Sequence, residues 1–391
     1  MNFLDTIEYI SGFSEDKIAW DLIESFFSGK SFHSFSEMRN TFQNPIFHGE
    51  GDVYTHTQMV CRELLKMPDF KILPEHNQTE LFFAALLHDA GKVKTTCIED
   101  GVFVSPKHSL IGSHIVREFL WKECNFSGTP EKQNFRETVC SLIRYHMLPV
   151  HLIEYENPQV KAMMTASIGE LAHDFSLNLL RILSEADVKG RIAYDIDEEL
   201  YRVQLFRMIA EESQCLYNSY SFADKFTEHA CFSGRNVQPD QVLYNDTWGK
   251  VIMMSGLPGT GKDTWISMNA PDMPVISLDE IRKELRIKPT DEQGAVIHTA
   301  QERAKELLRK KQLFIWNATD ITRDIRQKWI KLFERYNAGV RIVYLETDYY
   351  TLLKRNSERE NVVPESAIEK MLGKLSLPTP EEAETVEWHC V

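Results

Sequence analysis

The segment VIMMSGLPGTGKDTW, residues 251–265, contains the residue types that hold phosphate groups. Gly256 is followed, after four intervening residues, by Gly261 and Lys262, and the segment stands between an apolar run and an amphipathic stretch. That context predicts a loop between a buried strand and a helix. Glycines let backbone N–H groups approach phosphate oxygens, the helix N-terminus adds positive potential, and Lys262 would neutralise the β and γ phosphates. We predict a site for ATP or another NTP, with a cradle of Gly256, Pro258, Gly259, Thr260, Gly261, Lys262, Asp263 and Thr264.

The metal-binding position of this loop is unusual. Asp263 stands where a serine or threonine hydroxyl normally meets magnesium. Either the Asp263 carboxylate takes Mg²⁺ or Mn²⁺, directly or through water, or Thr264 supplies the hydroxyl. We favour a functioning site with altered metal coordination.

Charged side chains suited to a phosphate acceptor follow later apolar runs. Asp279 comes directly after VISL, and in an open α/β sheet the ends of the strands face the ligand. Its carboxylate can accept the proton of an attacking hydroxyl, while Arg282 can hold a phosphate of the substrate. Arg355 and Arg359 are four apart, so we expect both on one helix face, as a lid that stabilises charge on the transferring phosphoryl group. A helix cap and a solvated basic helix are the simpler alternatives.

These motifs together resemble the P-loop polynucleotide 5′-kinases over residues 248–375. The resemblance implies transfer of the NTP γ-phosphate to the 5′-OH of RNA or DNA. It assigns Asp279 as general base, Arg282 to the 3′-side phosphate of the acceptor, and Arg355 and Arg359 to the lid. It further implies acceptor and phosphate contacts for Asn317, Thr319 and Arg323, although Asn317 stands where that family often has a carboxylate.

Histidines and aspartates recur on otherwise apolar stretches of the first half of the chain. Burying so many titratable groups is costly unless something pairs with them, and a metal ion is an economical partner. Four N and O ligands suit manganese, iron, cobalt, nickel or zinc, and two further histidines could complete a second position. A bound ion would lower the pKa of a water molecule and polarise a phosphoryl oxygen, which favours phosphoester hydrolysis. The expected ligands are His56, His88, Asp89 and Asp187, then His108 and His146 with Asp89 bridging.

The spacing of these residues resembles the HD phosphohydrolase superfamily across residues 45–195. Its signature of His, then His-Asp, then a distal Asp falls on the first four of these ligands, and the extra histidines of its two-metal members fall on the other two. Lys92, one turn after His88, is expected to reach a substrate phosphate. The run HGEGDVYTHT at 48–57 also resembles the HD domain attached to bacterial tRNA CCA-adding enzymes, which act on 2′,3′-cyclic and 2′-phosphates.

The hydrophobic pattern changes character near residue 240. Before it, apolar residues recur with helical spacing, which predicts an all-helical domain over 1–240. After it, short apolar runs alternate with amphipathic stretches, which predicts a parallel sheet with helices on both faces over 241–391. We therefore expect an all-α HD phosphohydrolase domain followed by an α/β P-loop kinase domain.

Composition limits the functions that this chain can have. Residues 1–245 contain 22 Lys+Arg against 35 Asp+Glu, a balance of −13, and the rest contains 22 against 23, or −1. This argues against a broad basic surface that coats nucleic acid, while it permits a local anion-binding groove in the second domain. The seven cysteines are scattered without a CxxC pair, and no run is long enough to span a bilayer. A reducing cytoplasm and no membrane partner are expected.

The order of the two domains resembles the bifunctional bacterial end-healing enzymes that fuse an HD phosphoesterase to a polynucleotide kinase. That resemblance implies removal of 2′,3′-cyclic, 2′- or 3′-phosphate by the first domain and 5′ phosphorylation by the second. RNA or DNA ends are the expected substrate, with a nucleic-acid ligase as a candidate partner. Two alternatives stay open: a nucleotide phosphohydrolase fused to a nucleoside or other small-molecule kinase, and a non-catalytic NTP-dependent regulator.

Overall fold

The computed structural model describes residues 18–30, 32–359 and 361–391, and these fall into two compact units. The first comprises the described residues up to Phe126 together with Glu131–Tyr220, and the second comprises Ser127–Pro130 and Ser221–Val391. The segment 221–240 thus packs with the second unit. The predicted functional boundary at 240 stays a prediction, because compactness alone does not decide where a functional domain ends.

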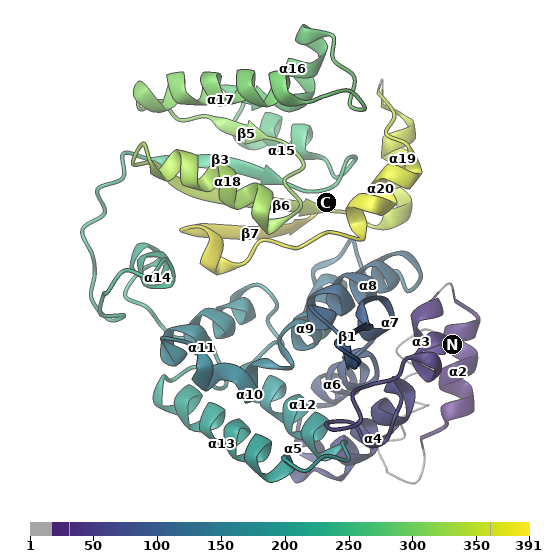
Figure 1. Cartoon of the computed structure of the whole chain (residues 1–391). Coiled ribbons are helices and arrows are strands. Elements are labelled where there is room, and N and C mark those ends of the chain that lie inside the picture. Colours follow the sequence, from purple (N-terminus) through teal and green to yellow (C-terminus); the bar gives the residue numbers. More distant parts are fainter. Residues whose placement is uncertain (1–17, 31, 360) are drawn as a thin grey trace. The chain divides into compact units, whose positions relative to one another are not determined.

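Helices build almost all of the described first unit, as predicted (Figure 1). Helix α6 is its central element, because each residue of Leu81–Leu87 is at most 2% exposed and a helix apolar all round belongs in a core. Helices α4 and α12 pack against it, and Asp52 and Ser176 cap their N-termini by accepting backbone N–H groups. The helices here are α2 (Trp20–Ser28), α3 (His33–Glu37), α4 (Val53–Lys66), α5 (Pro68–Lys71), α6 (Glu75–Leu87), α7 (Lys92–Thr95), α8 (His108–Lys122), α9 (Pro130–Tyr145), α10 (Leu148–His151), α11 (Pro158–Ala166), α12 (Leu177–Lys189) and α13 (Ile196–Glu212), with short 3₁₀ turns at η2 (Met38–Asn40), η3 (Leu152–Glu154) and η4 (Ser167–Glu170).

A small hairpin interrupts the helices and was not predicted. Strand β1 (Cys97–Glu99) pairs antiparallel with β2 (Val102–Val104). The turn between them is Asp100-Gly101, both with positive φ (51° and 80°), the conformation that a two-residue hairpin turn requires. The Asp-Gly pair was therefore the available sequence signal.

The second unit contains a five-stranded sheet of order β4-β5-β3-β6-β7, and all of its pairings are parallel. Helices flank it on both faces, which confirms the predicted α/β class. Strand β7 was not predicted. The strands are β3 (Lys250–Ser255), β4 (Val275–Ser277), β5 (Ile315–Asn317), β6 (Gly339–Glu346) and β7 (Thr385–Cys390), and the helices are α14 (Lys225–Phe232), α15 (Lys262–Asn269), α16 (Leu278–Leu285), α17 (Gly294–Arg309), α18 (Arg323–Glu334), α19 (Tyr349–Ser357) and α20 (Glu365–Leu372), with a 3₁₀ turn η5 (Pro380–Glu382).

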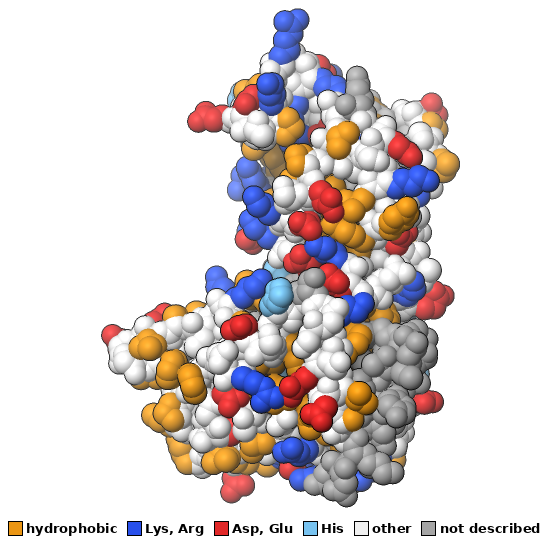
Figure 2. All heavy atoms as spheres, turned by 90° about the vertical axis from the view of Figure 1, so that its right-hand side faces the viewer, with side chains coloured by type: hydrophobic (Ala, Val, Ile, Leu, Met, Phe, Trp, Pro, Cys, Tyr) orange, Lys and Arg blue, Asp and Glu red, His pale blue; other side chains and the backbone are white. Residues whose placement is uncertain are grey.

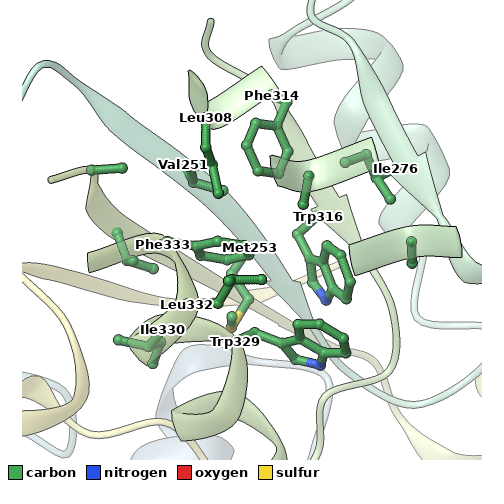
Figure 3. Close-up of a cluster of buried hydrophobic side chains, with 14 of the residues drawn as sticks. Val251, Met253, Ile276, Leu308, Phe314, Trp316, Trp329, Ile330, Leu332 and Phe333 are labelled. Carbon is green, nitrogen blue, oxygen red and sulfur yellow. The ribbon is translucent and has the colours of Figure 1, made fainter. Parts of the chain in front are cut away.

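The side chains of β3 point alternately to the two faces of the sheet, and each face has its own layer of the core. Val251 and Met253 face the cluster formed with α16, α17 and α18, while Ile252 and Met254 face α15. Successive strand residues point to opposite faces, so one strand serves both layers. In the larger layer the ring centroids of Trp316 and Trp329 lie 4.1 Å apart. Figure 3 shows both side chains within this buried cluster.

Within the described residues, no helix combines the length and the apolar character needed to cross a bilayer.

Candidate metal centre and nucleotide site

The predicted ligands of the first unit lie within or at the ends of five helices. His88 and His146 directly follow α6 and α9, His108 begins α8, and His56 and Asp187 lie within α4 and α12. Two sets of ligand atoms form, each with all of its atoms within 4.8 Å of one another. The first is His56, His88 and Asp187, and the second is Asp89, His108 and His146.

Two glycines allow the chain segments that carry these ligands to approach. A Cβ on Gly91 would lie 2.0 Å from the carbonyl oxygen of His108, so only glycine fits where the turn after Asp89 passes the start of α8. A Cβ on Gly190 would lie 2.6 Å from a Val60 side-chain carbon, which permits the end of α12 to touch α4. Sequence spacing could not reveal either approach.

Hydrogen bonds fix the tautomers of three of the histidines. The Nδ1 atoms of His88, His108 and His146 lie 2.8, 2.9 and 2.8 Å from the backbone carbonyl oxygens of Ala85, Ser105 and Ile143. A carbonyl only accepts, so each Nδ1 must donate. Each neutral ring therefore presents a lone pair at Nε2, the form that binds metals.

The acceptor atoms so defined point at one another. The Nε2 atoms of His108 and His146 are 3.4 Å apart, and Asp89 Oδ1 lies 3.6 Å from the former and 4.0 Å from the latter. Asp89 Oδ1 is buried and lacks a hydrogen-bond donor among the described residues. Burial lowers the pKa of His146 to about 3, which disfavours relief by protonation. This donor set fits a metal cation.

The acceptor atoms of the first ligand set also converge. His88 Nε2 lies 3.3 Å from His56 Nε2 and 3.4 Å from Asp89 Oδ2, while Asp187 Oδ1 lies 3.0 Å from His56 Nε2. Arg191 pairs with the other oxygen of Asp187 at 2.8 Å. Burial would raise the pKa of Asp187, but the charge of Arg191 and the neighbouring imidazoles hold it well below its usual value. The carboxylate therefore stays ionised and able to bind a cation.

Lys92 lies beside the second ligand set. Its Nζ is 2.7 Å from Asp89 Oδ2 and donates to Gln43 Oε1 at 2.6 Å. Sequence reasoning missed Gln43. It also missed Glu50, whose Oε1 lies 3.0 Å from His56 Nδ1 and 2.8 Å from His48 Nδ1. A carboxylate on the far nitrogen of a ligand histidine orients the ring, and the run HGEGDVYTH contained that signal.

The glycine-rich loop of the second unit connects β3 to α15, as predicted. Gly256, Gly259 and Gly261 have φ of 145°, 87° and 86°, which L side chains rarely adopt. Lys262 begins α15, and its Nζ donates to the carbonyl oxygens of Gly256 and Leu257 at 2.8 and 2.9 Å. Burial lowers the pKa of Lys262 to about 8. Pro258 and Thr260 lie inside the loop, and Thr264 is exposed in the first turn of α15.

The two unusual residues of this site contact each other. Asn317 ends β5, and its Nδ2 donates to Asp263 Oδ1 at 2.7 Å. An amide at 317 therefore satisfies the carboxylate at 263, where two carboxylates would repel. No described hydrogen bond involves the other oxygen of Asp263, so the residues present fit a magnesium or manganese ion at that oxygen.

Arg282 and Arg359 lie beside Asp279. Ser277, rather than Asp279, caps α16, because its hydroxyl accepts the N–H of Glu280. The exposed Asp279 forms an ion pair with Arg282 at 2.5 Å and lies 3.6 Å from Arg359 Nη2. A Cβ on Gly261 would lie 3.8 Å from Arg355 Nη1, which places that guanidinium beside the phosphate loop.

One helical expectation is wrong. Arg355 and Arg359 do not share a helix face, because α19 ends at Ser357. The Asn356 side chain donates to the carbonyl of Val363 at 2.7 Å and accepts its N–H at 3.1 Å, so the chain turns back after the helix. Arg359 lies in that turn.

The segment after β5 contacts the start of the phosphate loop. The carbonyl oxygen of Thr319 accepts the Gly256 N–H at 2.9 Å. Arg323, expected near acceptor and phosphates, is instead paired with Glu381. Sequence reasoning missed Asp320, a buried residue at φ 39° whose carbonyl oxygen accepts from the Ser255 hydroxyl at 3.0 Å. Burial raises the pKa of its carboxyl group to about 7.

Two known families match parts of the chain. Residues 52–189 match the family model of the HD domain, and residues 251–378 match the model of an AAA domain. The chain thus has an HD phosphohydrolase domain followed by a P-loop, kinase-like domain. This arrangement indicates a bifunctional, nucleotide-related enzyme with phosphoesterase and kinase activity.

Proposed function

We propose that this protein heals broken polynucleotide ends. The HD domain removes a 2′,3′-cyclic, 2′- or 3′-phosphate from RNA, and the kinase domain transfers the γ-phosphate of ATP or another NTP to a 5′-OH of RNA or DNA. The observation that carries the proposal is the convergence of Asp279, Arg282 and Arg359 beside a phosphate loop, in a chain that also holds the paired ligand sets of the metal centre.

In the first unit, metal ions bound by the two ligand sets would supply an activated water and a Lewis acid. The residues of the chain contribute the rest. Lys92 is already held by Gln43, so its ammonium group can pair with a substrate phosphate without a large rearrangement. Arg191 and Glu50 hold Asp187 and His56 in place.

In the second unit, Lys262 would exchange its two carbonyl partners for the β and γ phosphates of the NTP. Asp279 would accept the proton of the attacking 5′-hydroxyl, while Arg282 leaves Asp279 for the neighbouring phosphate of the acceptor. Arg355 and Arg359 would stabilise charge on the transferring phosphoryl group.

The test uses an RNA oligonucleotide with a 5′-OH and a 2′,3′-cyclic phosphate, incubated with labelled ATP and a panel of divalent metals. We expect both ends to be converted. Free nucleosides and cyclic mononucleotides form the competing substrate set, since the acidic first half of the chain also suits small substrates. Products made only from that set would contradict the proposal in favour of small-molecule metabolism.

Two variants separate the sites. Asp279→Ala should reduce 5′ phosphorylation by about 10²-fold or more, whereas Glu280→Ala, on the same exposed helical turn, should not. His88→Ala should abolish phosphate release and leave the kinase intact, with His76→Ala on the exposed start of α6 as its control. Full kinase activity in Asp279→Ala would show that the assigned base is wrong, and slow NTP hydrolysis without any acceptor would favour a regulator.

A further inference from the structure

Aromatic side chains are exposed on the segments that surround the candidate metal centre. The exposed fractions are 57% for Phe42, 39% for Phe47 and 78% for Tyr194. Large aromatic residues grouped on a surface usually mark a binding site. All three lie outside residues 52–189, so the HD domain match does not account for them.

Together with Phe103, these residues form two pairs. The ring centroids of Phe42 and Phe103 are 6.4 Å apart, and those of Phe47 and Tyr194 are 6.2 Å apart. The interplanar angles are 40° and 34°, so the two rings of each pair are tilted and do not lie flat on each other. The exposed rings of Phe42 and Tyr194 keep much of their surface available for a planar ligand.

The pair Phe42–Phe103 is joined to the second ligand set. Gln43, the residue after Phe42, accepts from Lys92. Phe103 lies on β2, and two residues later the carbonyl of Ser105 accepts from His108 Nδ1. The pair thus stands on the two segments that hold Lys92 and His108.

The pair Phe47–Tyr194 is joined to the first ligand set. Gly49 and Ile192 lie two residues from Phe47 and Tyr194 along the chain. The N–H of Gly49 donates to the carbonyl of Ile192 at 2.8 Å, and the N–H of Ile192 donates to Glu50. Glu50 in turn contacts the Nδ1 of His56.

The metal centre reaches solvent beside these two pairs. The His108 and Lys92 side chains are 16% and 10% exposed, and His48 is 12% exposed, while His56 and His88 are fully buried. Among these side chains, the partly exposed ones are those that a substrate phosphate can reach from solvent.

Charge indicates which substrates can use such a surface. The first 245 residues carry a net −13, and on the face drawn in Figure 2 the Lys and Arg side chains are interspersed with Asp and Glu. Affinity from many phosphate contacts is therefore not available. Unpaired bases can instead stack on aromatic rings. Such stacking accepts any base sequence and requires no positively charged surface.

We propose that the pairs Phe42–Phe103 and Phe47–Tyr194 hold unpaired bases next to the end of a single-stranded polynucleotide whose terminal phosphate lies at the metal centre. This inference rests on the proposed phosphoesterase function and specifies its substrate: a single-stranded end is preferred over a mononucleotide and over a base-paired end. Exposed Ile46 and Ile192 adjoin the pairs, so a protein partner is the competing occupant.

The first test compares KM values for a 2′,3′-cyclic phosphate at the end of a single-stranded hexanucleotide and in a cyclic mononucleotide. Phe42→Leu and Tyr194→Leu remove the rings and keep an apolar side chain. Each variant should raise the hexanucleotide KM about tenfold, in the range of one lost base stack. Hydrolysis of the mononucleotide should change less than about twofold, because one base cannot use both pairs.

The matched control is Tyr217→Leu. Tyr217 is 62% exposed and follows Leu216, whose carbonyl accepts the N–H of Asn178 at the start of α12, the opposite end of that helix from Asp187. This variant should leave both KM values unchanged.

The second test measures binding without turnover. A fluorescein-labelled hexanucleotide with a 5′-phosphate and a 3′-phosphate is titrated with the metal-free full-length protein, and anisotropy gives Kd. Phe42→Leu and Tyr194→Leu should weaken binding about tenfold, and the same sequence in a blunt duplex should bind less tightly than the single strand.

Each failure has its own signature. If the wild-type protein converts hexanucleotide ends and both variants match Tyr217→Leu, the stacking proposal is wrong and the proposed function stands. If the wild-type protein hydrolyses mononucleotides only, the proposed function itself fails. If the variants lose mononucleotide and hexanucleotide hydrolysis equally, the rings have a structural role, and if hexanucleotide binding is unaffected, the surface serves another partner.

Discussion

Replacing Asn317 by aspartate tests the altered metal position of the kinase site. The substitution removes the amide that donates to Asp263 Oδ1 at 2.7 Å and puts a second carboxylate in its place. The change is nearly isosteric, so packing around the end of β5 is preserved. The effect therefore isolates one hydrogen bond and one like-charge contact.

Two contributions set the loss of folding stability expected for Asn317→Asp. Loss of a hydrogen bond to a charged acceptor costs about 1.5–3 kcal/mol. Repulsion between unit charges about 4 Å apart is about 1 kcal/mol in water and about 4 kcal/mol near a protein surface. Asp263 is exposed and Asn317 is buried, so we take the lower half of both ranges and expect about 3 kcal/mol of destabilisation at pH 7.

The assay is a double-mutant cycle with Asn317→Asp, Asp263→Thr and the double variant. Native-state hydrogen exchange in peptides from β3, β5 and α15 reports the stability of the second unit alone. The double variant should recover at least about 2 kcal/mol relative to the sum of the single variants, because a hydroxyl can donate to the new carboxylate. ATP and magnesium binding should recover with it.

Additive losses in the cycle would refute this reasoning. They would mean that Asn317 and Asp263 do not interact in solution, and that the carboxylate at 263 is held by something other than the amide.

Other expected outcomes concern charge, packing and metal. Burial raises the pKa of Asp320 to about 7, so the folded state binds this proton more tightly than the unfolded state does. The free energy of unfolding should therefore fall as the pH rises from about 4 to about 7. Asp320→Asn should remove that fall and stabilise the protein by about 2–4 kcal/mol at pH 8, measured by urea unfolding. Arg326→Met, which leaves the buried Glu382 unpaired, should cost about 3–5 kcal/mol, whereas Arg341→Met, at the half-exposed pair with Glu387, should cost about 1 kcal/mol or less in the same measurement. Chelation of metal should lower the melting temperature of the first unit, and excess Mn²⁺ or Zn²⁺ should raise it. The reason is that the converging acceptor atoms repel one another without a cation. An unchanged melting temperature would argue against a metal centre.

The sequence predicted much of the second unit. Four apolar runs became β3, β4, β5 and β6, and the glycine-rich loop lies between β3 and α15. Such predictions succeed because strand periodicity and the φ values required of glycine are local properties of the chain. Strand β7 was missed, since it lies at an edge of the sheet and its residues are only partly buried. The end of α19 was missed because it depends on an Asn356 side chain that bonds seven residues ahead.

In the first unit the sequence supplied the ligand types, and the structure supplied their grouping. Residue types and helical spacing pointed to the histidines and aspartates, but their separations along the chain, such as 131 residues between His56 and Asp187, carry no distance information. Only packed helices reveal that lone pairs of His108 and His146 face each other, and that Gln43 and Glu50 hold neighbouring groups.

The sequence by itself therefore determined the local elements and the chemical inventory of both sites, because both depend on residue type and short-range spacing. Tertiary structure alone decided which residues meet: the amide of Asn317 with the carboxylate of Asp263, and the rings of Phe42 and Phe47 with those of Phe103 and Tyr194. These contacts come from burial and close approach across the chain, and no periodicity in the sequence encodes them.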